Sequence, residues 1–341
     1  MQIVVDGPYF EDLQVGQRFP AAPVTLTEGL AAAHQAVVGG RLPLAGAHLL
    51  SRQVLGDGVL AAPNLVWDVA IGQSTVVTHT VVANLFYRGV VFHRAPRLGD
   101  SLRTVTEVVG LRQNSRRPGR RSTGLVALRI GTDDQHGRPV LDFWRCAMLP
   151  LRDGSKDTGL TDDVSSVGRD PSGAELASVT ARWDLDAYRA VRPGPHFDGV
   201  RAGDVHVVAG GDVVSSAPEL ARLTGNVARV HHDDQGHGAG HGAGQGAGPS
   251  RLVYGGHTIG LALHQAVRAL PDMLTVVGWH GCDHLAPVRE GDTLTSAVTV
   301  ERTQPLSTGG GLVHLRSRVR ARRDGAEPTD VLDWRFVAAL A

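Results

Sequence analysis

Two stretches of sequence decide how the chain is organised: HRAPRLGDSL at 93–102 and HLAPVREGDTL at 284–294. Both read His-x-Ala-Pro, then a Gly-Asp pair, then Leu, and the second copy has one extra residue before the Gly-Asp pair. A second match, FEDLQVGQ at 10–17 against FDGVRAGD at 197–204, has nearly the same offset of about 190 residues. Two matches at a common offset predict a duplicated unit, with each copy inside the usual size range of a domain.

The duplication predicts two domains, at 1–153 and 181–341, joined by a linker at 154–180. The linker sequence is rich in Ser, Gly and Asp and has no apolar periodicity. Within the second domain, the run GHGAGHGAGQGAGPS begins at Gly236. Glycine at this density loses too much backbone entropy on folding to form an element by itself. We therefore expect residues 235–249 to form a flexible Gly/His-rich insert.

Each domain is expected to contain a loop, a helix and then several strands. Segments 101–112, 122–132 and 139–151 are rich in β-branched residues and are separated by turn sequences, which predicts antiparallel strands. In the second domain, apolar residues recur at helical spacing from 255 onward, and Pro271 stops this helix. One long helix wrapped by an antiparallel sheet is the hot-dog fold. The expected class is therefore α+β, a tandem (double) hot-dog fold.

Charge and cysteine content exclude several classes of protein. The chain has 34 Lys and Arg residues against 34 Asp and Glu residues, which gives no basic field for nucleic acid. Cys146 and Cys282 lie far apart, which indicates neither a disulfide framework nor a clustered zinc site and fits a reducing compartment. The opening MQIVVDGPYFEDL does not read as an export signal, and no run approaches the roughly 18 apolar residues of a membrane span. We expect a cytoplasmic protein without a nucleic-acid or membrane partner.

The motifs resemble those of the MaoC-like dehydratases, the R-specific enoyl-CoA hydratase group of hot-dog proteins. The family opening Phe-Glu-Asp-x-x-x-Gly is met as PYFEDLQVGQ, and the strand motif Pro-x-x-x-Gly-Asp-Thr-Leu as APVREGDTL. A closer resemblance is to the double hot-dog branch of mesaconyl-CoA hydratase, also called β-methylmalyl-CoA dehydratase. The stretches that carry it are VVANLFYRGVVFHRAPRLGDSLRTVTEVVGLRQNS, VLDFWRCAMLPLRD, LTGNVARVHHD and RLVYGGHTIGLALHQA.

The resemblance implies an active site in the second domain. The family signature is Gly-Asp-x-Asn-Pro-x-His, whose Asp and His hold the reacting water. It places Gly225 on the Gly, Asn226 on the Asp and His231 on the His. In the first domain the same alignment of GGRLPLA puts Gly40 and Ala45 at the two polar positions. The first domain is therefore expected to be degenerate, and the acid of the signature is missing from both domains.

Hydration of a 2-enoyl thioester needs a base, an acid and donors for the enolate oxygen. His231 is the expected base or acid because imidazole titrates near neutral pH. Asn226 is expected to orient the water or the substrate hydroxyl, and Asp233 or Asp283 to supply the missing carboxylate function. The paired His93 and His284 are expected to be structural.

The turn from Tyr254 to His257 precedes the long helix, so its free N–H groups lie at the positive end of the helix dipole. We expect the N–H of Gly256 or His257 to hold the enolate oxygen. Gly255 and Gly256 are equally compatible with close packing of the helix. The residues expected to line the substrate site are Gly225, Asp233, Tyr254 and Gly255.

Metal binding is the alternative use of the histidines in this region. The candidate ligands would be His232, Asp233, Asp234, His237 and His241. Their spacing fits no zinc pattern. We expect no metal and no cofactor.

The expected function is that of an acyl-CoA hydro-lyase. It would reversibly hydrate a short branched 2-enoyl-CoA such as mesaconyl-CoA, or dehydrate a 3-hydroxyacyl-CoA such as β-methylmalyl-CoA, with an acyl-CoA thioester as its partner. Two alternatives are a hot-dog thioesterase and a non-catalytic protein that binds acyl-CoA or an acyl carrier. Because each half can pair its sheet with the other, one chain is expected to be a pseudodimer, and a homo-oligomer of such chains remains open.

Overall fold

The computed structural model describes residues 6–233, 251–323 and 325–341. The predicted Gly/His-rich insert at 235–249 lies outside these residues. The strands are β1 (Arg18–Pro20), β2 (Val24–Thr25), β3 (Ala83–Phe92), β4 (Ser101–Gln113), β5 (Thr123–Asp133), β6 (Pro139–Pro150), β7 (Val205–Val207), β8 (Asp212–Val213), β9 (Met273–His284), β10 (Thr293–Pro305), β11 (Gly311–Arg322) and β12 (Thr329–Leu340). Strands β4, β5 and β6 coincide with the three segments that the sequence predicts.

Eight α-helices and three 3₁₀ turns accompany the strands in the described residues. The helices are α1 (Glu28–Val38), α2 (Pro43–Gly46), α3 (His48–Leu55), α4 (Pro63–Ser74), α5 (Gly173–Ser178), α6 (Leu185–Val191), α7 (Ala217–Leu223) and α8 (Gly255–Ala269). The 3₁₀ turns are η1 (Phe10–Asp12), η2 (His196–Gly199) and η3 (Arg229–His231). None of the helices in this part of the chain is long and apolar enough to cross a membrane.

The strands form one continuous antiparallel sheet that joins the two halves of the chain. The order is β1-β4-β5-β6-β3-β9-β12-β11-β10-β7, with β2 and β8 attached to β4 and β10. At the centre β3 pairs with β9, from Phe86 opposite Asp283 to Val91 opposite Gly278. This pairing removes the exposed edge that each half would otherwise present. The chain is therefore an α+β double hot-dog in which each half takes the place of a dimer partner.

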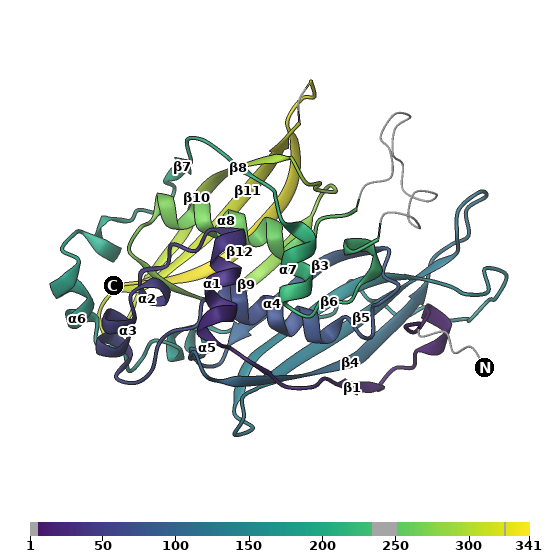
Figure 1. Cartoon of the computed structure of the whole chain (residues 1–341), viewed down its shortest axis with the longest axis horizontal. Helices are drawn as coiled ribbons and strands as arrows, with labels where there is room; N and C mark the ends of the chain where they lie inside the picture. Colours follow the sequence, from purple (N-terminus) through teal and green to yellow (C-terminus); the bar gives the residue numbers. More distant parts are fainter. Residues whose placement is uncertain (1–5, 234–250, 324) are drawn as a thin grey trace.

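The two longest helices, α4 and α8, lie against the same face of the sheet (Figure 1). Helix α8 begins and ends where its periodicity predicts, two residues before Pro271. Helix α4 is its counterpart in the first half, with sequence PNLVWDVAIGQS, and all of its residues are buried. A helix that is buried on every side has no apolar stripe, so periodicity gives no sign of α4.

The two central helices correspond residue by residue. Gln73 donates from Nε2 to the carbonyl of Leu102, and Gln265 donates from Nε2 to the carbonyl of Leu294, both at 2.9 Å. Both leucines close the repeated Gly-Asp motif, and Gln265 lies 192 positions after Gln73. At this offset Asp68 of α4 corresponds to Gly260 of α8.

The loops that carry the family signature correspond in the same way. Gly39 follows α1 with φ 73°, and Gly225 lies two residues after α7 with φ 70°. These left-handed conformations favour glycine. Counting onward from the two glycines sets Gly40 opposite Asn226 and Ala45 opposite His231, as the sequence alignment has it.

Parts of the predicted linker at 154–180 contact the sheet. Val164 is 3% exposed and packs against Ala127 and Cys146. Leu176 of α5 is buried, and its side chain would lie 2.6 Å from a Cβ on Gly278 of β9. Helix α5 therefore covers the junction of β3 and β9. Isolated apolar residues in a polar segment make no periodic pattern, which is why the sequence gives no sign of this contact.

Candidate active site

The candidate site is built on the loop that follows α7, and this loop is bound to the other half of the chain. The N–H of Val227 donates to Oγ1 of Thr75, at the end of α4, over 2.9 Å. A Cβ on Gly72 would lie 1.8 Å from the carbonyl oxygen of Thr224, so the backbone of α4 approaches the loop closely. The first half therefore positions the signature loop of the second half.

Asn226 holds the loop in shape from the inside. It is 2% exposed, and its Oδ1 accepts a hydrogen bond of 3.0 Å from the N–H of Ala228. His232 donates from Nε2 to the Asn226 carbonyl over 2.6 Å. Because Oδ1 is used by the loop, Nδ2 is the part of Asn226 that could donate to a substrate oxygen.

His231 has a defined tautomer. Its Nδ1 lies 2.8 Å from the carbonyl oxygen of Leu252. A carbonyl only accepts, so Nδ1 carries the proton and the neutral ring keeps its lone pair on Nε2. The ring also meets that of Tyr254 edge to face, with centroids 5.6 Å apart. His231 is therefore held in a defined orientation next to the start of α8.

Asp233 closes the loop, and Asp283 faces elsewhere. The N–H of Asp233 donates to the Arg229 carbonyl over 2.9 Å, and the residue is half-buried. The carboxylate of Asp283 pairs with Arg88 at 2.8 Å. The next residue, His284, points to the start of α8, because its Nε2 would lie only 2.6 Å from a Cβ on Gly255. Successive strand residues point to opposite faces. Asp283 is therefore turned away from α8, and the expectation that it could supply the missing carboxylate is wrong.

At the start of α8 only one of the two expected N–H donors is available. The N–H of His257 already donates to the Tyr254 carbonyl over 2.9 Å. Gly256 lies in the first turn, where an N–H has no acceptor within the helix. Of the two donors predicted for the enolate oxygen, the structure leaves Gly256.

The side chain of His257 is enclosed. It is fully buried, and neither ring nitrogen has a hydrogen-bond partner among the described residues. Burial, with a smaller contribution from His34, lowers the pKa of His257 to about 4. The ring is thus neutral near pH 7 and is not suited to exchange protons there.

A pair of residues from the first half, which the sequence does not single out, meets Tyr254. The Tyr254 hydroxyl donates to Oδ1 of Asp68 over 2.9 Å, and Nε2 of His34 lies 2.8 Å from Oδ2 of the same carboxylate. The side chains of His34 and Asp68 are each 1% exposed. Burial and the neighbouring Asp68 raise the pKa of Tyr254 well above its usual range. The one signal in the sequence is that Asp68 is the sole ionisable residue of α4.

Aromatic rings fill the space beside Tyr254. The ring of Trp67 is stacked on Tyr254, with an interplanar angle of 8° and centroids 6.4 Å apart. Tyr87 and Trp279 contact Trp67 at centroid distances of 4.9 and 4.8 Å. The site therefore has a rigid apolar wall on the side of the sheet.

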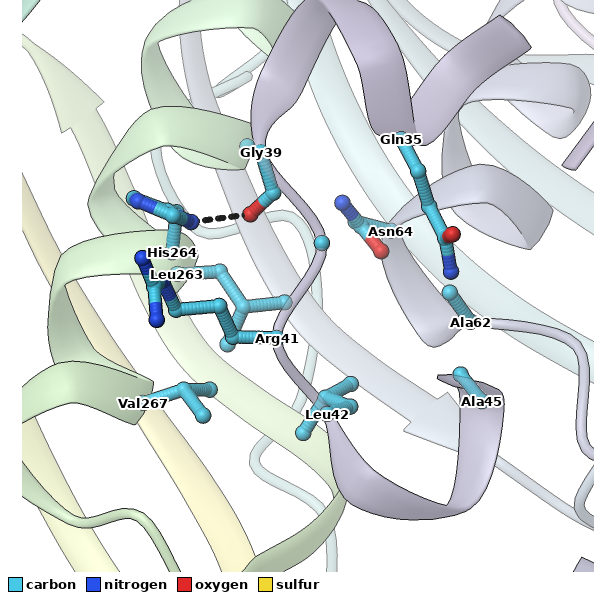
Figure 2. Close-up of a pocket in the computed structure, with 12 residues that line it drawn as sticks. Gln35, Gly39, Arg41, Leu42, Ala45, Ala62, Asn64, Leu263, His264 and Val267 are labelled. Atoms are coloured by element: carbon cyan, nitrogen blue, oxygen red, sulfur yellow. Dashed lines mark hydrogen bonds between the residues drawn. The ribbon is translucent and has the colours of Figure 1, made fainter. Parts of the chain in front are cut away.

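The equivalent place in the first half is hollow. A pocket opens there between the signature loop of the first half and α8, lined by Gln35, Gly39, Gly40, Arg41, Leu42, Ala45, Ala62, Asn64, Gly260, Leu263, His264 and Val267 (Figure 2). His264 is hydrogen-bonded to the Gly39 carbonyl at its edge. Within this lining, Gly40, Ala45, Ala62 and Gly260 stand at the positions that Asn226, His231, Tyr254 and Asp68 occupy around the signature loop of the second half. The hollow therefore exists because four small residues take the positions of four polar ones.

Two candidate ligands of the metal alternative, His232 and Asp233, lie in the described part of the chain. Residues 6–233, 251–323 and 325–341 contain no group of three or more His, Cys, Asp or Glu side chains that could hold a metal ion. Asp234, His237 and His241 lie outside the described residues.

Comparison with known proteins gives the following relatives. No family model matches the chain. A conserved protein of Mycobacterium tuberculosis with a double hotdog fold is 52% identical, with a TM-score of 0.90 over 98% of this chain and 99% of that one. The β-methylmalyl-CoA dehydratase of Chloroflexus aurantiacus is 28% identical over 91% of this chain and 87% of its own length. The mesaconyl-CoA hydratase of Cereibacter sphaeroides is also 28% identical, over 94% of this chain and 91% of its own length.

Proposed function

The chain belongs to the MaoC-like dehydratase family of double hot-dog proteins, and from this premise we propose that it interconverts a 2-enoyl thioester and its 3-hydroxyacyl hydrate. The observation that supports this reaction most directly is the orientation of His231. Its Nδ1–H is held by the Leu252 carbonyl, and its Nε2 is the basic atom beside the start of α8.

In the hydration direction the proposed roles are as follows. Nε2 of His231 takes a proton from water while the water oxygen bonds to C3 of the enoyl thioester. The charge that moves onto the thioester oxygen is met by the N–H of Gly256, at the positive end of α8. The Nδ2 group of Asn226 orients the water. A proton delivered to Cα of the enolate completes the hydration, and dehydration runs the same steps in reverse.

The proposed substrate is a short branched acyl-CoA. The two curated relatives are named for β-methylmalyl-CoA and mesaconyl-CoA, which differ by one molecule of water. We propose mesaconyl-CoA and β-methylmalyl-CoA as this pair.

Ultraviolet absorbance of the conjugated enoyl thioester tests the proposal. The purified chain is incubated with mesaconyl-CoA, crotonyl-CoA or their hydrates, and the enoyl band is followed with time. His231→Gln should abolish the change, because an amide cannot accept the proton. His136→Gln, in an exposed turn, serves as the matched control and should react like the unchanged chain.

Two other outcomes would decide for the alternatives. Release of free CoA thiol without a change in hydration would indicate thioesterase activity. Tight binding of the CoA esters with neither reaction would indicate a non-catalytic binding protein. Either result would contradict the hydro-lyase proposal for these substrates.

A further inference from the structure

We propose that Asp68 of the first half, held by His34, is the carboxylate that exchanges the α-proton of the substrate, in place of the acid that Asn226 replaces. The inference deepens the proposed function and rests on it. The first half has Gly40 and Ala45 in place of the two signature residues. Under this proposal it nevertheless contributes Asp68, one of the two groups that transfer protons.

The position of Asp68 is the first argument. Its counterpart in α8 is Gly260, which lines the pocket of the first half together with Gly40 and Ala45. By the correspondence of the two halves, Asp68 faces the loop that carries Asn226 and His231. Oδ1 of Asp68 would lie only 2.0 Å from a Cβ on Gly256. The carboxylate is therefore close to Gly256, whose N–H is the proposed donor to the thioester oxygen.

The second argument is that the fold does not need a polar pair at this place. In the second half Gly260 stands in the place of Asp68, and Leu220 stands in the place of His34. Leu220 is fully buried. A buried ion pair generally adds little stability compared with apolar side chains of similar volume. The second half therefore shows that the fold accommodates this place without a polar pair.

Charge is the third argument. A lone carboxylate next to Gly256 would repel the negative enolate. Nε2 of His34 lies 2.8 Å from Oδ2, so the ring can offset part of the charge of the carboxylate through this hydrogen bond. Each carboxylate oxygen has two lone-pair sites, so Oδ1 can accept the Tyr254 hydroxyl and keep a second site for a proton. The contact with His34 therefore reduces the repulsion between the carboxylate and the enolate.

With Asp68, Gly256 and His231 in these roles, every proton of the dehydration is accounted for. The Asp68 carboxylate takes the proton from Cα, and the electron pair of that bond forms the enolate held by Gly256. The enolate then expels the C3 hydroxyl, which takes a proton from Nε2 of the His231 imidazolium and leaves as water. Asp68 ends protonated and His231 neutral, and one proton returns from Asp68 to His231 through solvent. His34 is a positioning residue that orients the carboxylate and offsets its charge.

Steady-state kinetics with β-methylmalyl-CoA test the assignment. Asp68→Asn keeps the shape of the side chain and an acceptor for Tyr254 but cannot take a proton. It should lower kcat by about 10²–10⁴-fold with little change in KM. It should also remove the acid limb of the kcat–pH profile, because dehydration requires the ionised carboxylate. Asp68→Glu should restore part of kcat, and His34→Gln should shift the acid limb.

The matched control is Asp134→Asn. Asp134 is another carboxylate of the first half with a fully buried side chain, paired with Arg94 and Arg138 away from the site. Its substitution should weaken folding and leave kcat and the pH profile of the folded protein unchanged. Circular dichroism establishes which variants fold. If Asp68→Asn does not fold, the inference is tested by comparing the acid limbs of the kcat–pH profiles of Asp68→Glu and His34→Gln with that of the unchanged chain.

The outcomes separate the inference from the function on which it rests. If His231→Gln is inactive but Asp68→Asn keeps both kcat and the acid limb, the inference is overturned and the proposed function stands. If Asp68→Glu and His34→Gln both keep the unchanged acid limb, the inference is likewise overturned. If the unchanged chain reacts with no enoyl or hydroxyacyl thioester, both fail.

Discussion

Oδ1 of Asp68 lies 2.0 Å from the position that a Cβ on Gly256 would occupy, so the carboxylate of one half rests on the backbone of the other. The ring of Tyr254 would be 2.4 Å from the same Cβ. Gly256→Ala should therefore push both side chains out of place. We expect kcat to fall by about 10²-fold or more, since small displacements in an active site have effects of this size.

Steady-state kinetics of the folded variant measure this effect, and Gly29→Ala supplies the control. Gly29 is an exposed residue in the first turn of α1, and the atom nearest to a Cβ there is 4.0 Å away. Alanine at that position should leave kcat unchanged and add up to about 1 kcal/mol of stability. Full activity of Gly256→Ala would show that Asp68 and Tyr254 are not held against this glycine.

Gly72 provides a test of how α4 supports the signature loop. A Cβ there would lie 1.8 Å from the carbonyl oxygen of Thr224 and 3.2 Å from the backbone nitrogen of Asn226. Both neighbours are backbone atoms, so the loop itself has to shift. Gly72→Ala should lower the free energy of unfolding by about 1–3 kcal/mol and lower kcat with it. Urea unfolding and kinetics, with the unobstructed Gly131→Ala as reference, provide the measurement.

His257 makes folding stability depend on pH. Its folded pKa is about 4, below the unfolded value of about 6.5, so the unfolded chain binds the proton first as the pH falls. The histidine has no effect on stability above about pH 6.5, and its destabilising effect grows between pH 6.5 and 4. It levels off below pH 4. The loss should approach about 3 kcal/mol in total.

Denaturant unfolding of the unchanged chain and of His257→Leu from pH 4 to pH 8 isolates this effect. His314, whose pKa burial also lowers to about 4, remains in both proteins and cancels in the difference. The difference in unfolding free energy between the two proteins should be constant above pH 7 and should change steadily below it. A difference that is independent of pH throughout would contradict the buried, neutral state of His257.

The hollow in the first half should not become a second active site when its signature pair is restored. Gly40→Asn with Ala45→His, introduced into His231→Gln, returns the two signature residues to the first half. Gly260 and Ala62 still stand in the places of Asp68 and Tyr254, so we expect no recovery of the reaction. The enoyl absorbance assay decides this, and recovered activity would mean that the signature pair is sufficient by itself.

The sequence predicts those parts of the molecule whose pattern is local. Strands β4 to β6 alternate and α8 has an apolar face, so their positions follow from periodicity. Helix α4 is buried on all sides and shows no period. His231 and Asn226 can be named as candidates from the sequence because a contiguous signature carries them. Asp68 cannot, because its hydrogen-bond partner Tyr254 is 186 residues away in the sequence and no spacing motif connects the two.

The junction of β3 and β9 determines how the site responds to dilution. The residues of the proposed reaction come from both sides of that junction, with Asp68 on one side and Tyr254 on the other. In a dimer of separate hot-dog chains, such a site would be lost whenever the subunits dissociate. Here the peptide chain keeps the two halves at a high effective concentration at any protein level. The proposed reaction therefore does not require its two halves to meet from separate chains.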